Sequence, residues 1–329
     1  MKIAIIGYGK MGHMIEGIAL ERGHEICCRI DKDNLEEFDS EAFRGADVAI
    51  EFTTPATAAG NVSRCFEAQV PVVCGSTGWV NVVDPESGKT LLEVMKERCE
   101  NGEGTLMWAS NFSIGVNVFM AVNRYLARIM DSFPQYTPCM VETHHVHKLD
   151  HPSGTAITLA EQIVANTGRV SGWKETGDEG RALPSHATKK SAGAGASEIK
   201  ETTAGAEASE IKETTAGAGA SEIKETTAGA KASEISEAEA TTGAGASEIR
   251  EAGDGVLMEI GHVREGEVPG IHTIVWDSSV DDITITHSAK SRGGFALGAV
   301  MAAEWLAGKQ GFHTIGEMLT EMTKQDIFK

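Results

Sequence analysis

The feature that most constrains the fold lies at the start of the chain, where a glycine-rich turn follows a short apolar segment. Residues 2–6 have the composition of a buried strand, and Gly7-Tyr-Gly-Lys-Met-Gly12 then fits the pattern G-x-G-x-x-G. Helical spacing follows over 11–22, and Asp31 ends a second strand-like run. Such glycines admit a pyrophosphate at a helix amino terminus, and the acid binds an adenosine ribose. The pattern predicts a dinucleotide-binding fold, with a tight turn and a solvated aspartate as the alternative.

Strand and helix signals alternate through the first 110 residues, which predicts a parallel, doubly wound sheet. Later strand-like runs, two of them joined by a Pro-Gly turn, predict an antiparallel or mixed sheet. The expected strands are 2–6, 25–30, 48–52, 70–74, 105–109, 137–143, 256–263, 271–277 and 281–287. The expected helices are 11–22, one ending near 69, 115–130, 295–306 and 314–323.

Composition excludes several classes of protein. The net charge of −19 and the pI of about 5.0 argue against a nucleic-acid partner, which needs a basic face. No run of eighteen apolar residues occurs, so we expect no membrane span, and the apolar start is too short for a signal peptide. The six cysteines form no C-x-x-C pair and lie mostly in strand-like runs, which predicts reduced thiols in a cytoplasmic protein.

Residues 191–254 form a low-complexity insert built from a twelve-residue repeat, with one copy of fourteen residues. Each copy, such as GAGASEIKETTA, contains a single isoleucine and no aromatic residue. One large aliphatic side chain per repeat buries too little apolar surface to offset the entropy of ordering the chain. We therefore expect a disordered loop, with a small array that binds a partner as the alternative. The segment 173–186 matches no pattern.

A cluster of polar residues has the composition of a site that binds and protonates a small anion. Residues 142–156 read ETHHVHKLDHPSGTA. His144 can exchange a proton near neutral pH, and Lys148 supplies a compact positive charge. Ser153 begins a Ser-Gly-Thr turn at an expected helix start, where backbone N–H groups bind carboxylates.

The histidines of this cluster also raise the question of a metal site. Zinc binding requires that the chain curl so that four side chains converge on one ion: His144, His145, His147 and His151. The segment has no H-E-x-x-H spacing and no cysteine, and in a strand His144 points away from His145 and His147. We therefore predict no metal, and solvated positions for His147 and His151.

The residue after the second expected strand favours NADH as the cofactor. The carboxylate of Asp31 repels a 2′-phosphate, although Arg29 and Lys32 beside it offer partial compensation. We predict NADH, with NADPH tolerated. Two segments at strand ends, 75–78 and 109–113, are either contacts of the nicotinamide ribose or ordinary turns.

The cluster resembles the signature of the dihydrodipicolinate reductase family, in the spacing E-x-H-H-x-x-K-x-D-x-P-S-G-T-A. The similarity extends over almost everything except the repeat, at 7–12, 51–55, 75–78, 109–115 and 291–299. The resemblance implies an α/β protein with a Rossmann-type doubly wound parallel sheet, plus an α+β substrate domain whose open mixed sheet assembles a homotetramer. It also implies NAD(P)H-dependent reduction of 4-hydroxy-tetrahydrodipicolinate, or of dihydrodipicolinate, to tetrahydrodipicolinate in the diaminopimelate route to lysine.

The resemblance further implies domain boundaries and residue roles. Residues 1–114 with 292–329 are expected to bind the dinucleotide, and 115–190 with 255–291 to bind a small dicarboxylate substrate and to oligomerise. The catalytic positions are His144, as proton donor, and Lys148, as stabilising cation. The substrate-binding positions are His145, Ser153, Gly154 and Thr155. The cofactor-binding positions are Gly7, Gly9, Lys10, Met11, Gly12, Asp31, Thr53, Gly75, Ser76, Thr77, Ala109, Ser110, Asn111, Phe112 and Arg292.

Two other functions remain open at this point. Another Rossmann amino-acid or aldehyde dehydrogenase that used a covalent thiol would need a cysteine near the cofactor, for which Cys74 and Cys139 are candidates. A non-catalytic nucleotide sensor or scaffold would use the acidic repeat to recruit a partner. The presence of a proton donor at His144 favours the reductase over the sensor.

Overall fold

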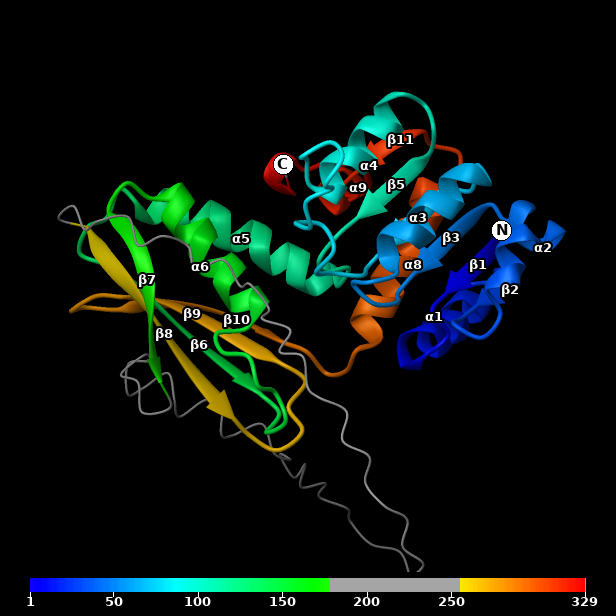
Figure 1. The fold of residues 1–329 in the computed structure, drawn as a ribbon. Helices are drawn as coiled ribbons and strands as arrows, with labels where there is room; N and C mark the ends of the chain where they lie inside the picture. Colours follow the sequence, from blue (N-terminus) through cyan, green and yellow to red (C-terminus); the bar gives the residue numbers. More distant parts are fainter. Residues whose placement is uncertain (178–254, 329) are drawn as a thin grey trace, which may run out of the picture.

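The computed structural model describes residues 1–177 and 255–328, which form two β-sheets with helices packed around them (Figure 1). The predicted insert at 191–254 lies outside the described residues, as does the later part of 173–186. Within the described ranges, none of the helices combines the length and the apolar character that a membrane crossing requires.

The first sheet has six parallel strands in the order β11-β5-β4-β3-β1-β2. Its central strands are buried on both faces, as expected for short apolar runs in a sheet covered by helices on both sides. The predicted doubly wound parallel sheet is confirmed, although the edge strand β11 was not among the predicted strands. The bounds are β1 Lys2–Ile6, β2 Glu25–Ile30, β3 Val48–Glu51, β4 Val72–Cys74, β5 Thr105–Trp108 and β11 Gly311–His313.

Helices cover both faces of this sheet and enclose two apolar cores (Figure 1). One core contains Phe38, Phe43 and Phe66 and lies under η1, α2, α3 and α4. The other lies under α1, α8 and α9, where small residues such as Ala299 and Ala303 let α8 approach the sheet closely. The bounds are α1 Lys10–Glu21, η1 Leu35–Asp39, α2 Glu41–Arg44, α3 Ala58–Glu67, α4 Leu91–Glu100, α8 Gly293–Leu306, α9 Ile315–Thr323 and η2 Asp326–Phe328.

The second sheet has five strands in the order β10-β9-β6-β8-β7, and it is mixed because β6 pairs in parallel with β8 and antiparallel with β9. Helices α5 and α6 cover one face over a core that includes Met140, Leu159 and Trp276 (Figure 1). The predicted mixed sheet is confirmed, and β7 adds a strand that was not predicted. The bounds are α5 Ile114–Met130, β6 Thr137–His144, α6 Gly154–Asn166, β7 Val170–Gly177, β8 Val256–Arg264, β9 Ile271–Asp277 and β10 Asp282–Ser288.

The chain crosses between the two sheets twice, and the crossings lie side by side. The first runs from β5 into α5, whose amino terminus is capped by the hydroxyl of Ser113. The second runs from β10 into α8, where a Cβ added to Gly294 would lie 3.3 Å from Oγ of Ser113. The second sheet is thereby held beside the carboxyl ends of the parallel strands, the edge at which open α/β sheets bind ligands.

Candidate active site between the two sheets

The glycine turn after β1 leaves the space that a bound pyrophosphate needs. Gly7 has a φ of +93°, and a Cβ there would lie 2.1 Å from the carbonyl oxygen of Phe52. A Cβ at Gly12 would lie 2.3 Å from the carbonyl oxygen of Gly7, whereas a Cβ at Gly9 would meet no atom within 4 Å. Gly9 is also the N-cap of α1, and no side chain caps this end of the helix. The N–H groups of the first turn, which includes Met11, therefore face outward and fit an anion.

Asp31 follows β2 at the same edge of the sheet. Its exposed carboxylate accepts a hydrogen bond from the backbone N–H of Lys32 at 2.9 Å. Arg29, one of the two cations that could compensate for a 2′-phosphate, is paired with Glu16, with Nε 3.1 Å from Oε1. The structure thus commits Arg29 to another carboxylate, while Lys10 and Lys32 are exposed.

The carboxyl ends of β3 and β4 meet around a buried carboxylate. Glu51 ends β3 and accepts hydrogen bonds from the hydroxyl of Thr53 and from the thiol of Cys74, the latter at 3.0 Å. The backbone N–H of Thr53 donates to Oγ of Ser76 at 2.8 Å. This network fixes the loops at the ligand edge of the sheet. The predicted cofactor positions that these loops bring together are Thr53, Gly75, Ser76 and Thr77.

The loop after β5 and the start of α8 continue this edge. Ala109 and Phe112 are buried, so they can meet a cofactor only through backbone atoms. A Cβ at Gly298 would lie 1.7 Å from the carbonyl oxygen of Phe112, which shows that α8 packs directly against the loop. Arg292 is exposed at the amino terminus of α8. The nucleotide half of the site therefore combines the first and the last segments of the chain.

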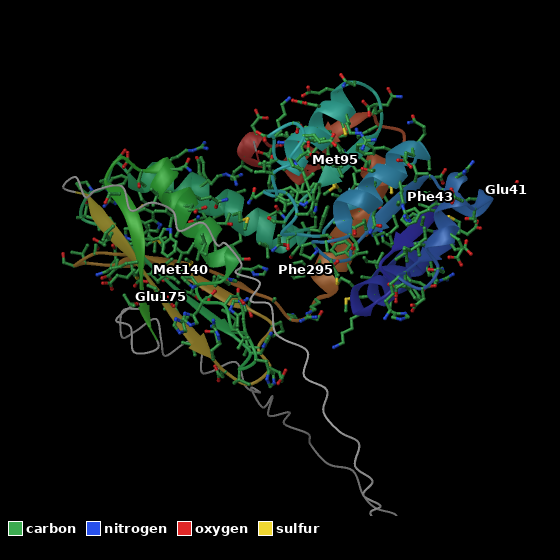
Figure 2. All side chains as sticks on the ribbon, viewed as in Figure 1. Glu41, Phe43, Met95, Met140, Glu175 and Phe295 are labelled. Carbon is green, nitrogen blue, oxygen red and sulfur yellow. The ribbon has the colours of Figure 1, made fainter. Side chains whose placement is uncertain are left out.

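A cleft of about 280 Å³ opens between the two halves of the molecule. Asn111 and Ser291 line its wall on the side of the parallel sheet, and His144 and Thr155 line the opposite wall. Phe295 lies where the two halves meet (Figure 2). A larger cavity of about 630 Å³ lies among η1, α2 and the end of α3. That cavity is at the other edge of the parallel sheet, away from the carboxyl ends of the strands, so we assign the site to the cleft.

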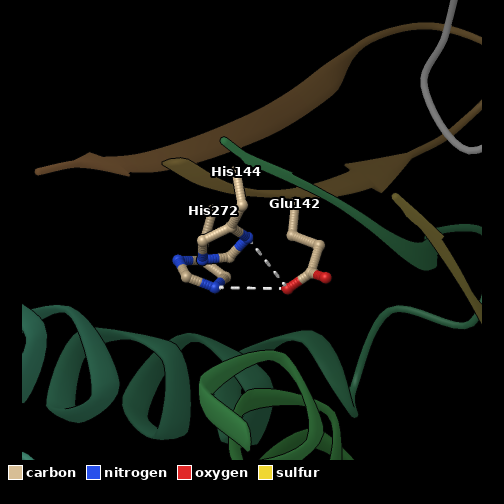
Figure 3. Close-up of side chains that lie close together, drawn as sticks. All are labelled: Glu142, His144 and His272. Carbon is tan, nitrogen blue, oxygen red and sulfur yellow. Dashed lines mark ion pairs between the residues drawn. The ribbon is translucent and has the colours of Figure 1, made fainter. Parts of the chain in front are cut away.

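Glu142 is the centre of a polar network beside the cleft (Figure 3). It is fully buried on β6, and both of its oxygens accept hydrogen bonds from the backbone N–H of Ser153 at 3.1 Å. Its Oε2 lies 3.6 Å from Nδ1 of His144 and 3.6 Å from Nε2 of His272, and its Oε1 lies 3.4 Å from Arg264. Burial acts to raise the pKa of Glu142, but the contacts with His272, Ser153 and His144 outweigh it and lower the pKa to about 2. Glu142 is therefore ionised at neutral pH.

His144 lies at the end of β6 and is buried in the cleft wall. Its Nδ1 faces Glu142, and its Nε2 faces Gly270, where a Cβ would lie only 3.0 Å away. Burial lowers the pKa of His144 to about 4; Glu142 opposes this shift, and the positive charges of Lys148 and Arg264 add to it. In this structure His144 is therefore a neutral imidazole at neutral pH.

Lys148 and His145 lie in the turn between β6 and α6. Nζ of Lys148 lies 2.6 Å from each carboxylate oxygen of Asp150, and the half-buried ring of His145 lies 6.1 Å from that of His147. Neither residue is among those that line the cleft. The structure therefore places His144 in the cleft wall. Lys148 does not line the cleft and is paired with Asp150.

The start of α6 has the predicted form. Ser153 is the N-cap, and its Oγ accepts a hydrogen bond from the backbone N–H of Ala156 at 3.2 Å. Gly154 begins the helix, and a Cβ added there would meet no atom within 4 Å. Thr155 follows it and lines the cleft. The helix start expected from the sequence therefore lies beside the cleft, with Thr155 in its wall.

Two histidines line the cleft that sequence reasoning missed. His272 on β9 lies opposite Glu142, and His287 on β10 lies opposite His272, so the three side chains form a row across neighbouring strands. Nε2 of His272 lies 3.2 Å from Oγ of Ser153, and burial lowers the pKa of His287. Both histidines fall in predicted strands, but only the order and register of the strands place them beside Glu142.

The sequence matches two family models along almost its whole length. Residues 1–112 match the model described as dihydrodipicolinate reductase, N-terminus, and residues 115–319 match the model described as dihydrodipicolinate reductase, C-terminus. The chain belongs to the dihydrodipicolinate reductase family. The two matches meet in the loop between β5 and α5, where the chain first crosses from one sheet to the other.

Individual relatives agree with this assignment. A 4-hydroxy-tetrahydrodipicolinate reductase of Christiangramia forsetii is 34% identical over 324 residues, which are 98% of this chain and 100% of that protein. The enzyme of the same name from Neisseria meningitidis serogroup B is 24% identical over 305 residues, 92% of this chain and 83% of that protein. A dipicolinate-bound dihydrodipicolinate reductase from Paenisporosarcina sp. TG-14 shares the fold, with a TM-score of 0.58, 18% identity and coverage of 95% and 97% of the two chains.

These findings confirm the family, the fold class and the reductase activity that the sequence predicted, with NAD(P)H as the cofactor pair of the dihydrodipicolinate reductase family. The choice between NADH and NADPH, the oligomeric state and the roles of single residues stay predictions.

Proposed function

We propose that the cleft between the two sheets is where this chain reduces 4-hydroxy-tetrahydrodipicolinate, or the dihydrodipicolinate derived from it, with NAD(P)H. The observation that carries the proposal is the composition of the two walls. Asn111 and Ser291 lie on the wall beside the nucleotide loops, and His144 and Thr155 lie on the wall formed by the second sheet and α6. A reduced nicotinamide and a small dicarboxylate held on these two walls would meet across the cleft.

The nucleotide half fits the cofactor. Gly7 and Gly12 permit the tight turn and its close packing, Gly9 leaves room for a pyrophosphate, and the uncapped start of α1 favours its charge. When bound, the nicotinamide would supply the hydride. We infer a preference for NADH because Asp31 is free to accept hydrogen bonds from a ribose while Arg29 is already paired with a carboxylate.

The second half fits the dicarboxylate. Backbone N–H groups at the start of α6, around Gly154 and Thr155, can bind one carboxylate, and the open space at Gly154 leaves room for it. The hydroxyl of Ser153 faces His272, which lines the same cleft. His145 is a further candidate contact, provided that its ring turns toward the cleft when substrate binds.

His144 is the proposed proton donor. Hydride addition to a conjugated C=N/C=C system leaves negative charge on a neighbouring atom, and a general acid at that atom lowers the barrier. A dianionic substrate would raise the pKa of His144 from its low value by supplying negative charge beside the imidazole. Lys148 would leave Asp150 and turn toward the same charge, which makes its present ion pair a resting position.

The other candidate functions have less support. Thiol chemistry needs a lowered thiol pKa, but burial raises the pKa of Cys139 to about 12 and also raises that of Cys74. Neither cysteine lines the cleft. A sensor or scaffold would not need a proton donor such as His144 in the cleft wall.

We also infer a homotetramer and a cytoplasmic location. The face of the second sheet opposite α5 and α6 carries partly exposed aliphatic side chains on neighbouring strands, Val141, Leu257 and Val263. An apolar sheet face of this kind fits a second subunit. All six cysteines are free, as expected of a protein in a reducing compartment. The two sheets support the proposed division into residues 1–114 with 292–329 and 115–190 with 255–291.

The test is a coupled assay. Dihydrodipicolinate synthase generates the substrate, and the oxidation of NADH and of NADPH is followed separately. We expect turnover with both cofactors and a higher kcat/KM with NADH. Cofactor binding without turnover would favour the sensor instead.

A further inference from the structure

A second group of polar side chains lies near the first but outside the cleft. Nδ1 of His151 lies 2.6 Å from Oε1 of Glu175, and Nδ1 of His262 lies 2.7 Å from the same oxygen. The two imidazole rings are stacked, with centroids 4.3 Å apart and planes inclined by 19°. The ligand atoms of the three residues all lie within 4.8 Å of one another. Glu175 projects from β7 at the end of the second sheet (Figure 2).

The topology brings these three residues together from separate segments. Glu175 is on β7, His262 is on the neighbouring strand β8, and His151 ends the turn that carries Lys148. Of the four histidines within 142–156, only His151 belongs to this group. The prediction of no metal from the sequence concerned convergence of those four, so it does not extend to a group completed by Glu175 and His262.

The group of His151, Glu175 and His262 differs from the network around Glu142 in the positively charged side chains that pair with its carboxylate. Oε1 and Oε2 of Glu142 already accept hydrogen bonds from a backbone N–H, and the guanidinium of Arg264 lies 3.4 Å away and repels a cation. Among the described residues, the ion pairs of Glu175 involve only the two histidines, and no lysine or arginine joins them. One carboxylate and two imidazoles, with no lysine or arginine paired to the carboxylate in the part of the chain that the structure describes, form a favourable donor set for a divalent ion.

We propose that His151, Glu175 and His262 bind one divalent transition-metal ion, with Zn²⁺ as the best match. Zinc takes imidazole nitrogens and carboxylate oxygens at about 2.0–2.2 Å, usually with four ligands, so three protein ligands leave one position for water. Both imidazoles must be neutral with hydrogen on Nε2 when the ion binds, because the metal needs the lone pair of Nδ1. The rings must open from their stacked arrangement, and His151, whose side chain is 47% exposed, has the freedom to turn.

The ion would fasten the turn that contains Lys148 to the sheet. Arg264 already holds this turn through the carbonyl oxygens of Lys148 at 3.1 Å and of Asp150 at 2.8 Å. A metal bound at His151 adds a second attachment directly before the start of α6. The site is therefore structural, and it does not depend on the assignment of the reaction.

The test uses the full chain, freed of metal with EDTA and titrated with ZnCl₂ by isothermal calorimetry. We expect one ion bound per chain with a Kd that rises at least about tenfold in His151→Ala and in Glu175→Gln. His147→Ala is the matched control, because this exposed histidine lies in the same turn but outside the group. Its Kd is expected to equal that of the wild type. Co²⁺ in place of Zn²⁺ should give the visible absorption of tetrahedral coordination in the wild type and in His147→Ala only.

A second measurement separates loss of the site from loss of folding. Thermal unfolding without metal should give similar Tm values for all four proteins, and Zn²⁺ should raise the Tm of the wild type and of His147→Ala alone. The proposal is overturned if the wild type binds no zinc. It is also overturned if His151→Ala and Glu175→Gln bind zinc as tightly as the wild type, or if His147→Ala loses the ion equally. None of these readouts uses turnover, so failure here leaves the reductase proposal intact.

Discussion

Oε2 of Glu142 lies 3.6 Å from Nδ1 of His144, two residues further along the same strand. The two side chains share a face of β6 because side chains alternate along a strand. Glu142 is ionised and His144 is neutral at neutral pH. This arrangement favours hydrogen on Nδ1 and leaves Nε2 toward Gly270 and the cleft, where it would take up the proton to be donated once bound substrate raises the pKa of His144. Glu142 is therefore a positioning residue for the proposed proton donor.

Replacement of His144 by alanine should lower kcat far more than it changes KM. General acid catalysis contributes about 10²–10⁴-fold to a rate, and the carboxylate contacts at the start of α6 stay intact. Steady-state kinetics with NADH measure both parameters. His147→Ala is the control, because that side chain is exposed outside the cleft and its loss should leave kcat unchanged. Equal activity of His144→Ala and the wild type would remove His144 from the mechanism.

Glu142→Gln should lower kcat and lower the pKa of His144 further. The negative charge of Glu142 raises the pKa of His144, whereas burial and the nearby cations lower it. Removal of that charge leaves the influences that lower the pKa unopposed. NMR titration of the His144 ring measures the shift, and Glu142→Asp should restore part of it. A pKa that rises in Glu142→Gln would contradict the positioning role.

Much of the fold could be predicted from the sequence, because the patterns that indicate each strand and helix are local. The apolar runs predicted nine of the strands, and the Ser-Gly-Thr turn predicted the start of α6. The edge strand β11 has only three residues, too few for a periodic pattern. Helix α4 has a capping box formed by Thr90 and Glu93, a local signal that the pattern of apolar residues did not bring out.

Only part of the candidate site could be predicted from the sequence. His144 and Ser153 belong to one continuous segment, so their proximity follows from the sequence. His272 and Glu142 are far apart in the chain and meet because β9 pairs with β6 in one particular register. A shift by one residue would turn His272 to the other face, so no local pattern could place it.

Stability should fall as the pH falls below about 6.5, the ordinary pKa of histidine. His144 has a lower pKa in the folded state, about 4, so the unfolded chain binds more protons between these values. Its contribution, on the order of 3 kcal/mol, is present above pH 6.5 and is lost as the pH falls to 4. Glu142 contributes above pH 4.5 and loses its contribution as the pH falls toward 2. Urea unfolding of the wild type and of His144→Gln should show a shallower decline for the variant between pH 6.5 and 4.

Substitutions of Asp31 and of Glu16 should both shift the cofactor preference from NADH toward NADPH. Asp31→Ser replaces the ionised carboxylate acceptor for the ribose with a weaker hydroxyl and removes the charge that repels a 2′-phosphate, so the KM for NADH should rise and that for NADPH should fall. Glu16→Gln releases Arg29, which should lower the KM for NADPH without changing that for NADH. The ratio of kcat/KM for the two cofactors measures both effects. A ratio unchanged in both variants would show that neither Asp31 nor Arg29 reads the 2′ position.

Removal of residues 193–252 should leave the rates with NADH and NADPH unchanged. Strands β7 and β8 pair in parallel, so the connection from Gly177 to Val256 must join opposite ends of the two strands. A parallel connection needs about a dozen residues, and the shortened chain keeps 178–192 and 253–255 for it. Eighteen residues can span up to about 60 Å, more than twice the length of an eight-residue strand. A fall in kcat with an unchanged Tm would assign the repeat a part in catalysis, whereas equal rates would leave it a passive extension of the loop.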